Sequence, residues 1–459
     1  MMMSMQLSEA ARILDGRCSG ADVGFRGIST DTRKLAPGSL FFALQGPNFD
    51  GHAYVDAALE QGAAAAAVSR HCNSPLPQVE VGDTRLALGR LAAHWRSRFE
   101  LPVIAITGSN GKTTVRAMTG SILSCCGRTL STQGNLNNDI GLPLTLARMD
   151  AADEFAVLEM GANHPGEIDY LAGIAQPSIA VVTNAGPAHL EGFGDLEGVA
   201  RAKGEVFARL GSDGLAVINA DDVFAPLWRE LAGHCQVIEF GLRANVPVTA
   251  KWHGDATGSD VALVTPQGGI DLRLSLPGRH NIMNALAATA VAQAAGAGLD
   301  AVRAGLESLQ PVAGRFNIYK LAGGVVLIDD TYNANPESLQ VALDVLAQAQ
   351  GETWLVLGDM GELGETAADL HAAAGDSARS AGVSRLYGLG GLACAAVRNF
   401  AGPGGCFADM DTLLAALRAD LSRPLHILVK GSRRMRMERV ITSLRAELAD
   451  ITTSPREEN

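Results

Sequence analysis

The sequence predicts an α/β protein of three domains, and three observations carry this prediction. At 459 residues the chain is too long to fold around a single apolar core. Short apolar runs alternate with helical stretches along most of its length, which is typical of sheets built from parallel strands. One of these runs leads directly into a glycine-rich loop of the phosphate-binding type. We expect a small N-terminal α/β module at 1–83, a central parallel-sheet domain at 84–313 and a C-terminal Rossmann-like domain at 314–459.

The N-terminal module is indicated by short apolar runs between glycine and polar turns, at Val23–Ile28, Leu40–Leu44 and Ala63–Val68. Among them we expect one helix, near Ala53–Glu60. A further helix is predicted over Thr84–Phe99, where apolar residues recur at about 3.6-residue intervals and lead into the central domain.

The central domain is predicted from apolar strand patterns that are separated by helical stretches. Strands are expected at Val103–Ile106, Phe155–Leu158, Ile179–Thr183 and Leu215–Ile218, and an alanine-rich helix at Asn281–Ala295. In a sheet of this kind, ligands bind at the carboxyl ends of the strands.

The C-terminal domain repeats the pattern. Its strands are expected at Val325–Ile328, Trp354–Leu357, Arg385–Gly388 and His426–Val429, and a disordered tail is expected from Thr452.

The loop Thr107–Thr114, with the sequence TGSNGKTT, is the most informative stretch of the chain. Its glycines let backbone amides converge on an anion, and the following helix adds roughly half a positive charge at its N-terminus. Lys112 is expected to reach the terminal phosphates of a nucleotide, and the Thr113 hydroxyl to bind the accompanying magnesium ion. General P-loop spacing would place a glycine where this chain has Ile106, so we interpret the loop as a shortened variant.

Two polar residues follow neighbouring strands of the same sheet. Glu159 comes directly after Phe155–Leu158, and His189 follows the strand that begins at Ile179. Taken singly, each would be interpreted as an ordinary loop or surface residue. Because a carboxylate and an imidazole at adjacent strand ends can bind one metal ion, their shared position favours a metal site.

Composition excludes several classes of function. With 47% hydrophobic residues and a net charge of −12, the chain is a packed globular protein with no general affinity for nucleic acid or anionic membranes. The start has no signal-peptide pattern, and no run of eighteen apolar residues predicts a membrane span, so we expect a cytoplasmic protein. The seven cysteines lack Cys-x-x-Cys pairing and are interpreted as reduced, mostly buried thiols.

Five motifs in order resemble the Mur ligases, ATP-dependent amide-forming enzymes of peptidoglycan precursor synthesis, over nearly the whole chain. They are the loop Thr107–Thr114, Glu159–Asn163, His189–Gly194, Arg201–Phe207 and Arg279–Ala287. A further string, Ile328–Ser338 (IDDTYNANPES), resembles the branch of the family that adds D-alanyl-D-alanine. Gly134–Gly141 resembles the family's substrate loop, and Leu357–Gly364 also supports that branch.

The resemblance implies a P-loop ATPase-like central domain and assigns roles to residues. It implies catalytic roles for Lys112, Lys203, Glu159 and His189, and metal binding by Thr113, Glu159, His189 and Lys203. ATP would be bound by Gly108, Ser109, Asn110, Gly111, Lys112, Thr113, Thr114, Asn281, Arg315 and Asp330. The peptide substrates would be bound by Asn135, Asn138, Tyr332, Asn333, Asn335, Lys430 and Ser432, and the uridine diphosphate by Ser29, Thr30, Arg33, Asn48, Phe49, Asp50, Gly51 and His52. Without the resemblance, the two N-terminal loops would be interpreted as ordinary turns.

Lys203 is implied to be carbamylated. An ammonium group about 4 Å from a magnesium ion would be repelled by roughly 8 kcal/mol at an effective dielectric constant near 20. Members of the family avoid this by converting the lysine of this motif into an anionic carbamate, derived from CO2. Without the motif, a solvent-facing lysine on a helix would be the expectation.

The implied reaction joins D-alanyl-D-alanine to a UDP-N-acetylmuramoyl-tripeptide, with ATP and two magnesium ions, on a monomeric chain. Because the implied groups lie on three domains, we expect ATP and acceptor to close the chain about hinges near Asp83 and Pro311.

Three alternatives stay open at this point. Gly388–Ala393 matches the dinucleotide fingerprint and would suit a nicotinamide or flavin enzyme, although no acidic residue ends a second strand about twenty positions later. A non-catalytic ATP sensor would use the loop alone. A folylpolyglutamate synthase, from the same superfamily, usually has serine after the loop lysine and lacks a uridine module, so Thr113 and residues 1–83 argue against it.

Overall fold

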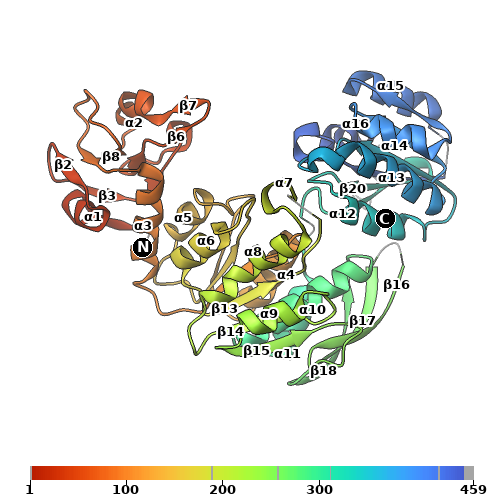
Figure 1. The fold of residues 1–459 in the computed structure, drawn as a ribbon, viewed down its shortest axis with the longest axis horizontal. Helices are drawn as coiled ribbons and strands as arrows, with labels where there is room; N and C mark the ends of the chain where they lie inside the picture. Colours follow the sequence, from red (N-terminus) through yellow and green to blue (C-terminus); the bar gives the residue numbers. More distant parts are fainter. Residues whose placement is uncertain (1–2, 188–189, 256–257, 311, 422–423, 449–459) are drawn as a thin grey trace, which may run out of the picture.

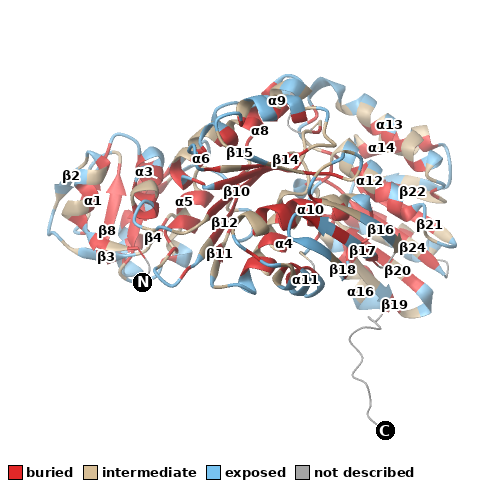
Figure 2. Cartoon of the chain, turned by 90° about the horizontal axis from the view of Figure 1, so that it is seen from below, coloured by how far each residue is buried: buried red, intermediate tan, exposed pale blue. Residues whose placement is uncertain are grey.

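The structure is a computed structural model that describes residues 3–187, 190–255, 258–310, 312–421 and 424–448. The N-terminal and C-terminal modules lie at opposite ends of the central one (Figures 1 and 2). The predicted metal ligand His189, the predicted hinge at Pro311 and the tail from Thr452 lie outside the described residues.

The N-terminal module is a five-stranded sheet with small hairpins at its edges. Its strand order is β2-β9-β8-β5-β4, in which only β2 runs antiparallel to its neighbour. The strands are β2 (Arg17–Ser19), β9 (Gln78–Glu80), β8 (Ala65–Val68), β5 (Leu40–Phe42) and β4 (Ile28–Ser29), and β1 (Ser4–Gln6) pairs with β3 (Gly24–Arg26), as β6 (Gln45–Gly46) does with β7 (Phe49–Asp50).

The prediction of one helix in this module was wrong. Besides α2 (Val55–Glu60), the chain forms α1 (Leu7–Leu14). In α1 the residues Leu7, Ala10, Ala11 and Leu14 are all buried, at the spacing of one helix face, so the apolar contact of this face stabilises a short helix.

The central module contains a six-stranded, fully parallel sheet of order β11-β12-β10-β13-β14-β15, as the sequence predicts. Its strands are β11 (Thr129–Ser131), β12 (Phe155–Glu159), β10 (Val103–Thr107), β13 (Ile179–Val182), β14 (Leu215–Asn219) and β15 (Gln236–Phe240). The helices are α3 (Thr84–Arg96), α4 (Lys112–Ser124), α5 (Gly141–Leu146), α6 (Glu167–Ala175), α7 (Leu190–Phe193), α8 (Leu196–Ala208), α9 (Ala225–Leu231), α10 (Arg279–Ala294) and α11 (Leu299–Glu307).

Alternating residues of the central strands point to two separate apolar layers. Val103 and Ala105 belong to the layer with α3, α6, α8 and α9, whereas Ile104 and Ile106 belong to the layer with α4, α10 and α11. Figure 2 shows buried residues along these strands. The second layer also includes an antiparallel sheet that was not predicted, of β16 (Thr249–Asp255), β17 (Gly258–Thr265) and β18 (Gly268–Leu274).

The first apolar layer extends into the N-terminal module. It includes Phe42 and Val79 of the N-terminal sheet together with Leu88 of α3 and Leu158 of the central sheet. The expected boundary at 83 therefore divides the chain but not the apolar core.

The C-terminal module is a six-stranded sheet with helices on both faces. Its order is β19-β20-β24-β21-β22-β23, and all neighbours except β19 and β20 are parallel. The strands are β19 (Asn317–Leu321), β20 (Val325–Asp330), β24 (Leu425–Lys430), β21 (Glu352–Gly358), β22 (Arg385–Leu389) and β23 (Gly404–Phe407), and the helices are α12 (Pro336–Leu346), α13 (Ala367–Ser380), α14 (Ala393–Phe400), α15 (Met410–Asp420) and α16 (Glu438–Leu448). Helices α12, α13 and α14 cover one face, and α15 and α16 cover the other.

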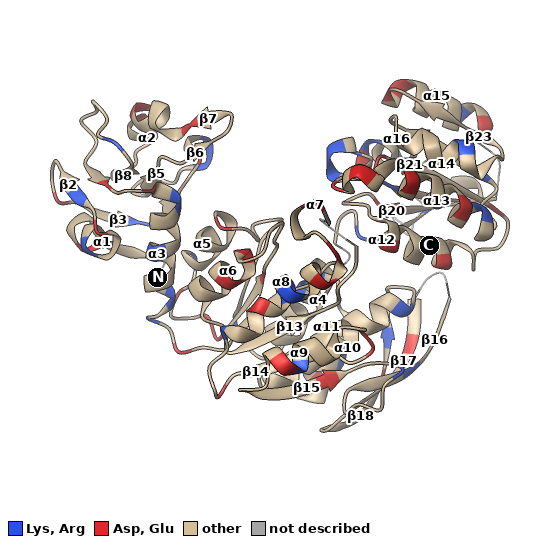
Figure 3. Cartoon of the chain, viewed as in Figure 1, with Lys and Arg blue, Asp and Glu red and all other residues tan. Residues whose placement is uncertain are grey.

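The surface carries charges of both signs over all three modules (Figure 3). All seven cysteines are free thiols, but the prediction that most are buried was wrong, because Cys18, Cys125, Cys126 and Cys406 are exposed and the others are half-buried. Among the helices of the described ranges, none has both the length and the apolar character needed to cross a bilayer.

Candidate active site

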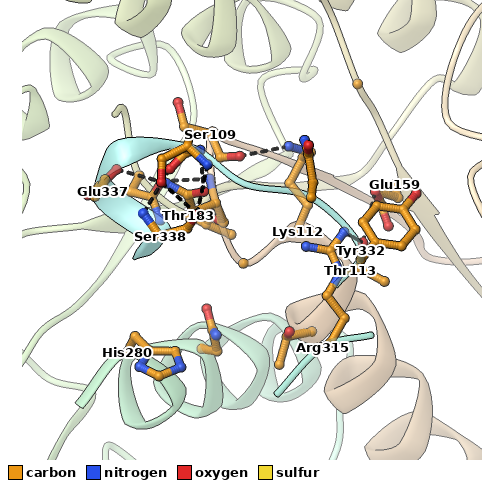
Figure 4. Close-up of a pocket in the computed structure, with 18 of the residues that line it drawn as sticks. Ser109, Lys112, Thr113, Glu159, Thr183, His280, Arg315, Tyr332, Glu337 and Ser338 are labelled. Atoms are coloured by element: carbon orange, nitrogen blue, oxygen red, sulfur yellow. Dashed lines mark hydrogen bonds between the residues drawn. The ribbon is translucent and has the colours of Figure 1, made fainter. Parts of the chain in front are cut away.

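A cleft of about 1390 Å³ lies between the central and C-terminal modules. It is lined by the phosphate loop, by residues that follow β12, β13 and β14, by α10, and by the loops that follow β20 and β24 (Figure 4). Both sheets therefore present the carboxyl ends of their strands to one space, which is where ligands bind in such folds.

The phosphate loop needs glycine at two positions. Gly108 has φ +138°, and a Cβ there would lie 2.0 Å from Thr183 Oγ1. Gly111 has φ +81°, and a Cβ there would lie 2.4 Å from Asn284 Oδ1. Both distances are shorter than the distances at which Cβ atoms contact other atoms in proteins, so a larger residue at either position would displace the backbone of the loop.

The loop is held by the segment that follows β13. Thr183 Oγ1 donates to Asn110 O at 2.6 Å, Asn110 N donates to Asn184 Oδ1 at 2.9 Å, and Ser109 N donates to Asn184 O at 3.0 Å. These bonds position the loop in the absence of ligand, so little ordering is needed when an anion binds.

Lys112 lies folded over the loop. Its Nζ donates to Gly108 O at 2.7 Å and to Ser109 O at 3.0 Å. Burial, opposed by Glu159 and aided by Arg315, lowers the pKa of Lys112 to about 8. A phosphate group at the loop would supply an anionic partner for this ammonium group.

Thr113 and Glu159 meet at the start of α4. Thr113 Oγ1 donates to Glu159 Oε1 at 3.2 Å, and Asn137 Nδ2 donates to the same oxygen at 2.9 Å. The other oxygen, Oε2, pairs with Arg116 Nε at 3.2 Å, and both side chains are largely buried. The sheet thus aims one carboxylate oxygen at the Thr113 hydroxyl, while Arg116 compensates the charge.

Lys203 is buried on α8, 1% exposed, and does not line the cleft. Its Nζ donates to Ala162 O at 3.1 Å and lies 4.9 Å from the centre of the Phe193 ring. Burial, and after it Lys112, lower the pKa of Lys203 to about 7, against the opposing effect of Glu167 and Glu205. No carboxylate in the described ranges forms an ion pair with this amine.

Residues of the C-terminal module contact the phosphate loop directly. Arg315 Nη2 donates to Thr113 Oγ1 at 3.2 Å, and Arg315 Cζ lies 3.9 Å from the centre of the Tyr332 ring. Asn110 is bound from the other side by Asn335 and Glu337 of α12. Arg315 therefore lies against the phosphate loop at the start of α4.

At the far wall of the cleft, Lys430 Nζ donates to Asp330 and, at 3.1 Å, to Asn333 O. Asp330, Asn333 and Lys430 line the cleft, whereas Ser432 does not. The Ser432 hydroxyl instead donates to Asp359 O at 2.6 Å, so it holds two strand-end loops together.

Sequence comparison identifies the family of this site. The chain matches the Mur ligase middle domain at residues 106–292, the Mur ligase glutamate ligase domain at 314–433 and the Mur ligase catalytic domain at 24–96. It is 46% identical to the UDP-N-acetylmuramoyl-tripeptide--D-alanyl-D-alanine ligase of Escherichia coli, over 96% of this chain and 99% of the relative. The chain belongs to the Mur ligase family, in its MurF branch.

Other relatives agree with this assignment to the Mur ligases. The Haemophilus influenzae protein of the same name is 41% identical over 97% of this chain and all of its own length. A crystal structure of MurF from Acinetobacter baumannii superposes with a TM-score of 0.91, at 36% identity, covering 96% of this chain and 99% of that one. The MurF ligase of Thermotoga maritima, solved with ADP, has a TM-score of 0.82 at 30% identity and covers 92% and 98%.

The cleft brings together most of the residues that the Mur ligase resemblance assigns to ATP. Ser109 to Thr114, Asn281, Arg315 and Asp330 all line it. Asn281 is buried, donates to Pro277 O at 2.8 Å and accepts from Asn284. Its amide therefore shapes the start of α10 in this state.

Most of the residues assigned to the peptide substrates line the cleft, and Ser432 does not. Those that line it are Asn135, Asn138, Tyr332, Asn333, Asn335 and Lys430. Asn138, however, uses its Oδ1 to accept from Gly141 N at 2.9 Å, as a cap of α5.

The uridine diphosphate residues of the N-terminal module lie away from this cleft. Phe49 is 53% exposed. Asp50 and His52 are instead bound within the module: His52 Nδ1 lies 2.6 Å from Asp50 Oδ1, and His52 Nε2 accepts from Ser69 N at 2.9 Å. Arg33 is exposed and paired with Asp31. Ser29 ends β4 and Thr30 follows it, while Asn48 lies in the turn between β6 and β7 and Gly51 follows β7.

Sequence reasoning missed three residues of the site. Arg116 and Asn137 both contact Glu159, and Glu337 contacts Asn110. Arg116 lies three residues after Thr113 in α4, so helical spacing could have found it. Nothing in the local pattern could have distinguished Asn137 from Asn135 and Asn138.

The dinucleotide alternative is opposed by the geometry at Gly388–Ala393. Asp359 Oδ1 accepts from Ala393 N at 2.7 Å, and a Cβ at Gly390 would lie 2.6 Å from the Asp359 carboxylate. A pyrophosphate would have to bind at this helix start, and a side-chain carboxylate already takes that position. Resemblance to folylpolyglutamate synthase, at 20% identity and a TM-score of 0.63, extends to the fold alone.

Proposed function

We propose that the chain is an ATP-dependent ligase that joins D-alanyl-D-alanine to UDP-N-acetylmuramoyl-tripeptide, giving the UDP-linked pentapeptide, ADP and phosphate. The observation that carries this proposal is the cleft in which a phosphate loop faces Arg315, Asp330 and Lys430 of a second sheet. The relatives that carry the name of this ligase match the chain from end to end.

The reaction follows from the need for a leaving group. A carboxylate does not condense with an amine in water, so the tripeptide carboxylate first attacks the γ-phosphorus of ATP and releases ADP. The amine of the dipeptide then attacks the acyl phosphate carbon, and the tetrahedral intermediate loses phosphate. The developing charge on the phosphoryl group is stabilised by the loop amides, Lys112 and Arg315.

The residues around Thr113 suit magnesium. The Thr113 hydroxyl and Glu159 Oε1 are hard oxygen donors 3.2 Å apart, and Arg116 binds only the other carboxylate oxygen. A magnesium ion held there would neutralise phosphate charge. The described part of the chain shows no group of three or more His, Cys, Asp or Glu side chains that could hold a metal ion, so we assign a second ion to His189 and a modified Lys203.

Carbamylation of Lys203 is supported by its burial with no acidic ion-pair partner among the described residues. An unpaired ammonium group in this position is costly, and conversion to a carbamate would replace it with two acceptor oxygens. The modified side chain would be a metal ligand in place of a cation.

We further propose that the protein acts in the cytoplasm as a monomer. Both substrates and ATP would contact residues of one chain, so no second copy is needed to complete the site.

The test uses the purified protein with ATP, magnesium, UDP-N-acetylmuramoyl-tripeptide and D-alanyl-D-alanine. ADP release and a product whose mass is the sum of both substrates less water are expected. Nucleotide binding without phosphate release would favour an ATP sensor, and turnover with a folate and glutamate instead would favour the synthase.

A further inference from the structure

A carboxylate lies directly on the phosphate loop. Glu337, in the first turn of α12, accepts from Asn110 Nδ2 through Oε2 at 2.7 Å. The same oxygen would lie only 1.8 Å from a Cβ at Gly186, so it rests against the backbone that follows β13. Figure 4 shows Glu337 near Ser109 of the loop and near Thr183, which follows β13.

The contact is built into the start of α12. Asn335 is the N-cap of this helix: its Oδ1 accepts from Ser338 N at 2.8 Å, while its Nδ2 donates to Asn110 Oδ1 at 3.0 Å. Both ends of the Asn110 amide are therefore bound by the first turn of one helix. A capped helix start is a stiff support, so Glu337 is held in place.

The Glu337 carboxylate has the same sign of charge as a nucleotide phosphate bound at the loop. The loop amides and the N-terminus of α4 attract anions, and the Glu337 carboxylate lies beside them, bound to the Asn110 side chain. Burial raises the pKa of Glu337, and Asp222 also raises it, against the opposing bond from Asn110. A triphosphate would bring several negative charges to the same loop, and like charges repel one another.

We propose that Glu337 sets the affinity of the site for nucleotide: its carboxylate lies at the edge of the phosphate loop and weakens the binding of ATP. This proposal rests on the proposed function, in that ATP is taken as the ligand of the loop.

The test compares ATP affinities in the presence of magnesium by titration calorimetry on the full chain. Glu337→Gln keeps the length of the side chain and an oxygen that can accept from Asn110, but removes the charge. We expect its Kd for ATP to fall by about tenfold. Glu337→Ala removes both the charge and the hydrogen bond, and its Kd is expected to fall at least as far.

Asp344→Asn is the matched control. Asp344 lies on the same helix and lines the same cleft, but its carboxylate accepts from Gln340 and does not contact the loop. Its Kd is expected to stay within twofold of wild type. The proposal is overturned if the Kd of Glu337→Gln is unchanged or higher, or if the Kd of Asp344→Asn falls as far as that of Glu337→Gln. Absence of ATP binding by the folded wild type would instead overturn the proposed function, and this inference with it.

Discussion

Replacing Lys112 by alanine tests the phosphate loop most directly. In the free protein its Nζ makes two hydrogen bonds to loop carbonyls, at 2.7 and 3.0 Å. An ammonium group about 4 Å from a phosphate charge gains about 4 kcal/mol at an effective dielectric constant near 20. Giving up two loop bonds costs about 1 kcal/mol each. The net loss on substitution is therefore about 2 kcal/mol, or roughly thirtyfold in turnover.

The assay follows ADP release with ATP and both substrates at saturating concentrations, and circular dichroism with thermal unfolding checks the fold. Lys251→Ala is the control, because Lys251 is an exposed lysine on β16. We expect Lys112→Ala to lose about 97% of its activity at an unchanged unfolding temperature, and Lys251→Ala to lose none. A folded Lys112→Ala protein with wild-type turnover would refute the assignment of the loop.

Three further predictions concern other parts of the molecule. His371 is buried and accepts a hydrogen bond from Met360 N, and burial lowers its pKa. Since its pKa is lower in the folded protein than in the unfolded chain, the free energy of unfolding should fall by up to about 1.4 kcal/mol for each pH unit below about pH 6.5. A His371→Gln variant that kept this slope would contradict the account. Asp359→Ala should lower the free energy of unfolding by about 1–2 kcal/mol, because the bond to Ala393 N is lost, and equilibrium denaturation would measure this. The same variant should gain no affinity for NAD in a binding titration. Protein prepared in 13C-bicarbonate should show a carbamate carbon resonance that is absent from Lys203→Arg; equal spectra would exclude the modification.

Much of the nucleotide site could be predicted because it is local in sequence. A strand, a glycine-rich turn and a helix start are consecutive, so the residues that cradle phosphate are neighbours along the chain. Glu159 was predictable for a related reason, since parallel strands end at one edge of a sheet. The observed β10 and β12 confirm that placement, with Ile106 paired to Glu159.

Contacts between distant segments could not be predicted. Glu337 and Asn110 are 227 residues apart, and Arg315 and Thr113 are 202 apart, so no periodicity or spacing connects them. The same limit applies to the bond of the Ser432 hydroxyl to Asp359 O, which joins two loops far apart in the sequence.

By itself, the sequence determined the main strands of the two parallel sheets, the phosphate loop and the family, because these depend on residue types at short separations. Only the tertiary structure decided which charged groups face one another across the cleft, which amides are already bound within their own module, and where an opposing carboxylate lies. The physical reason is that electrostatic energies depend on distances in space and on burial, and both are set by how the two sheets pack together.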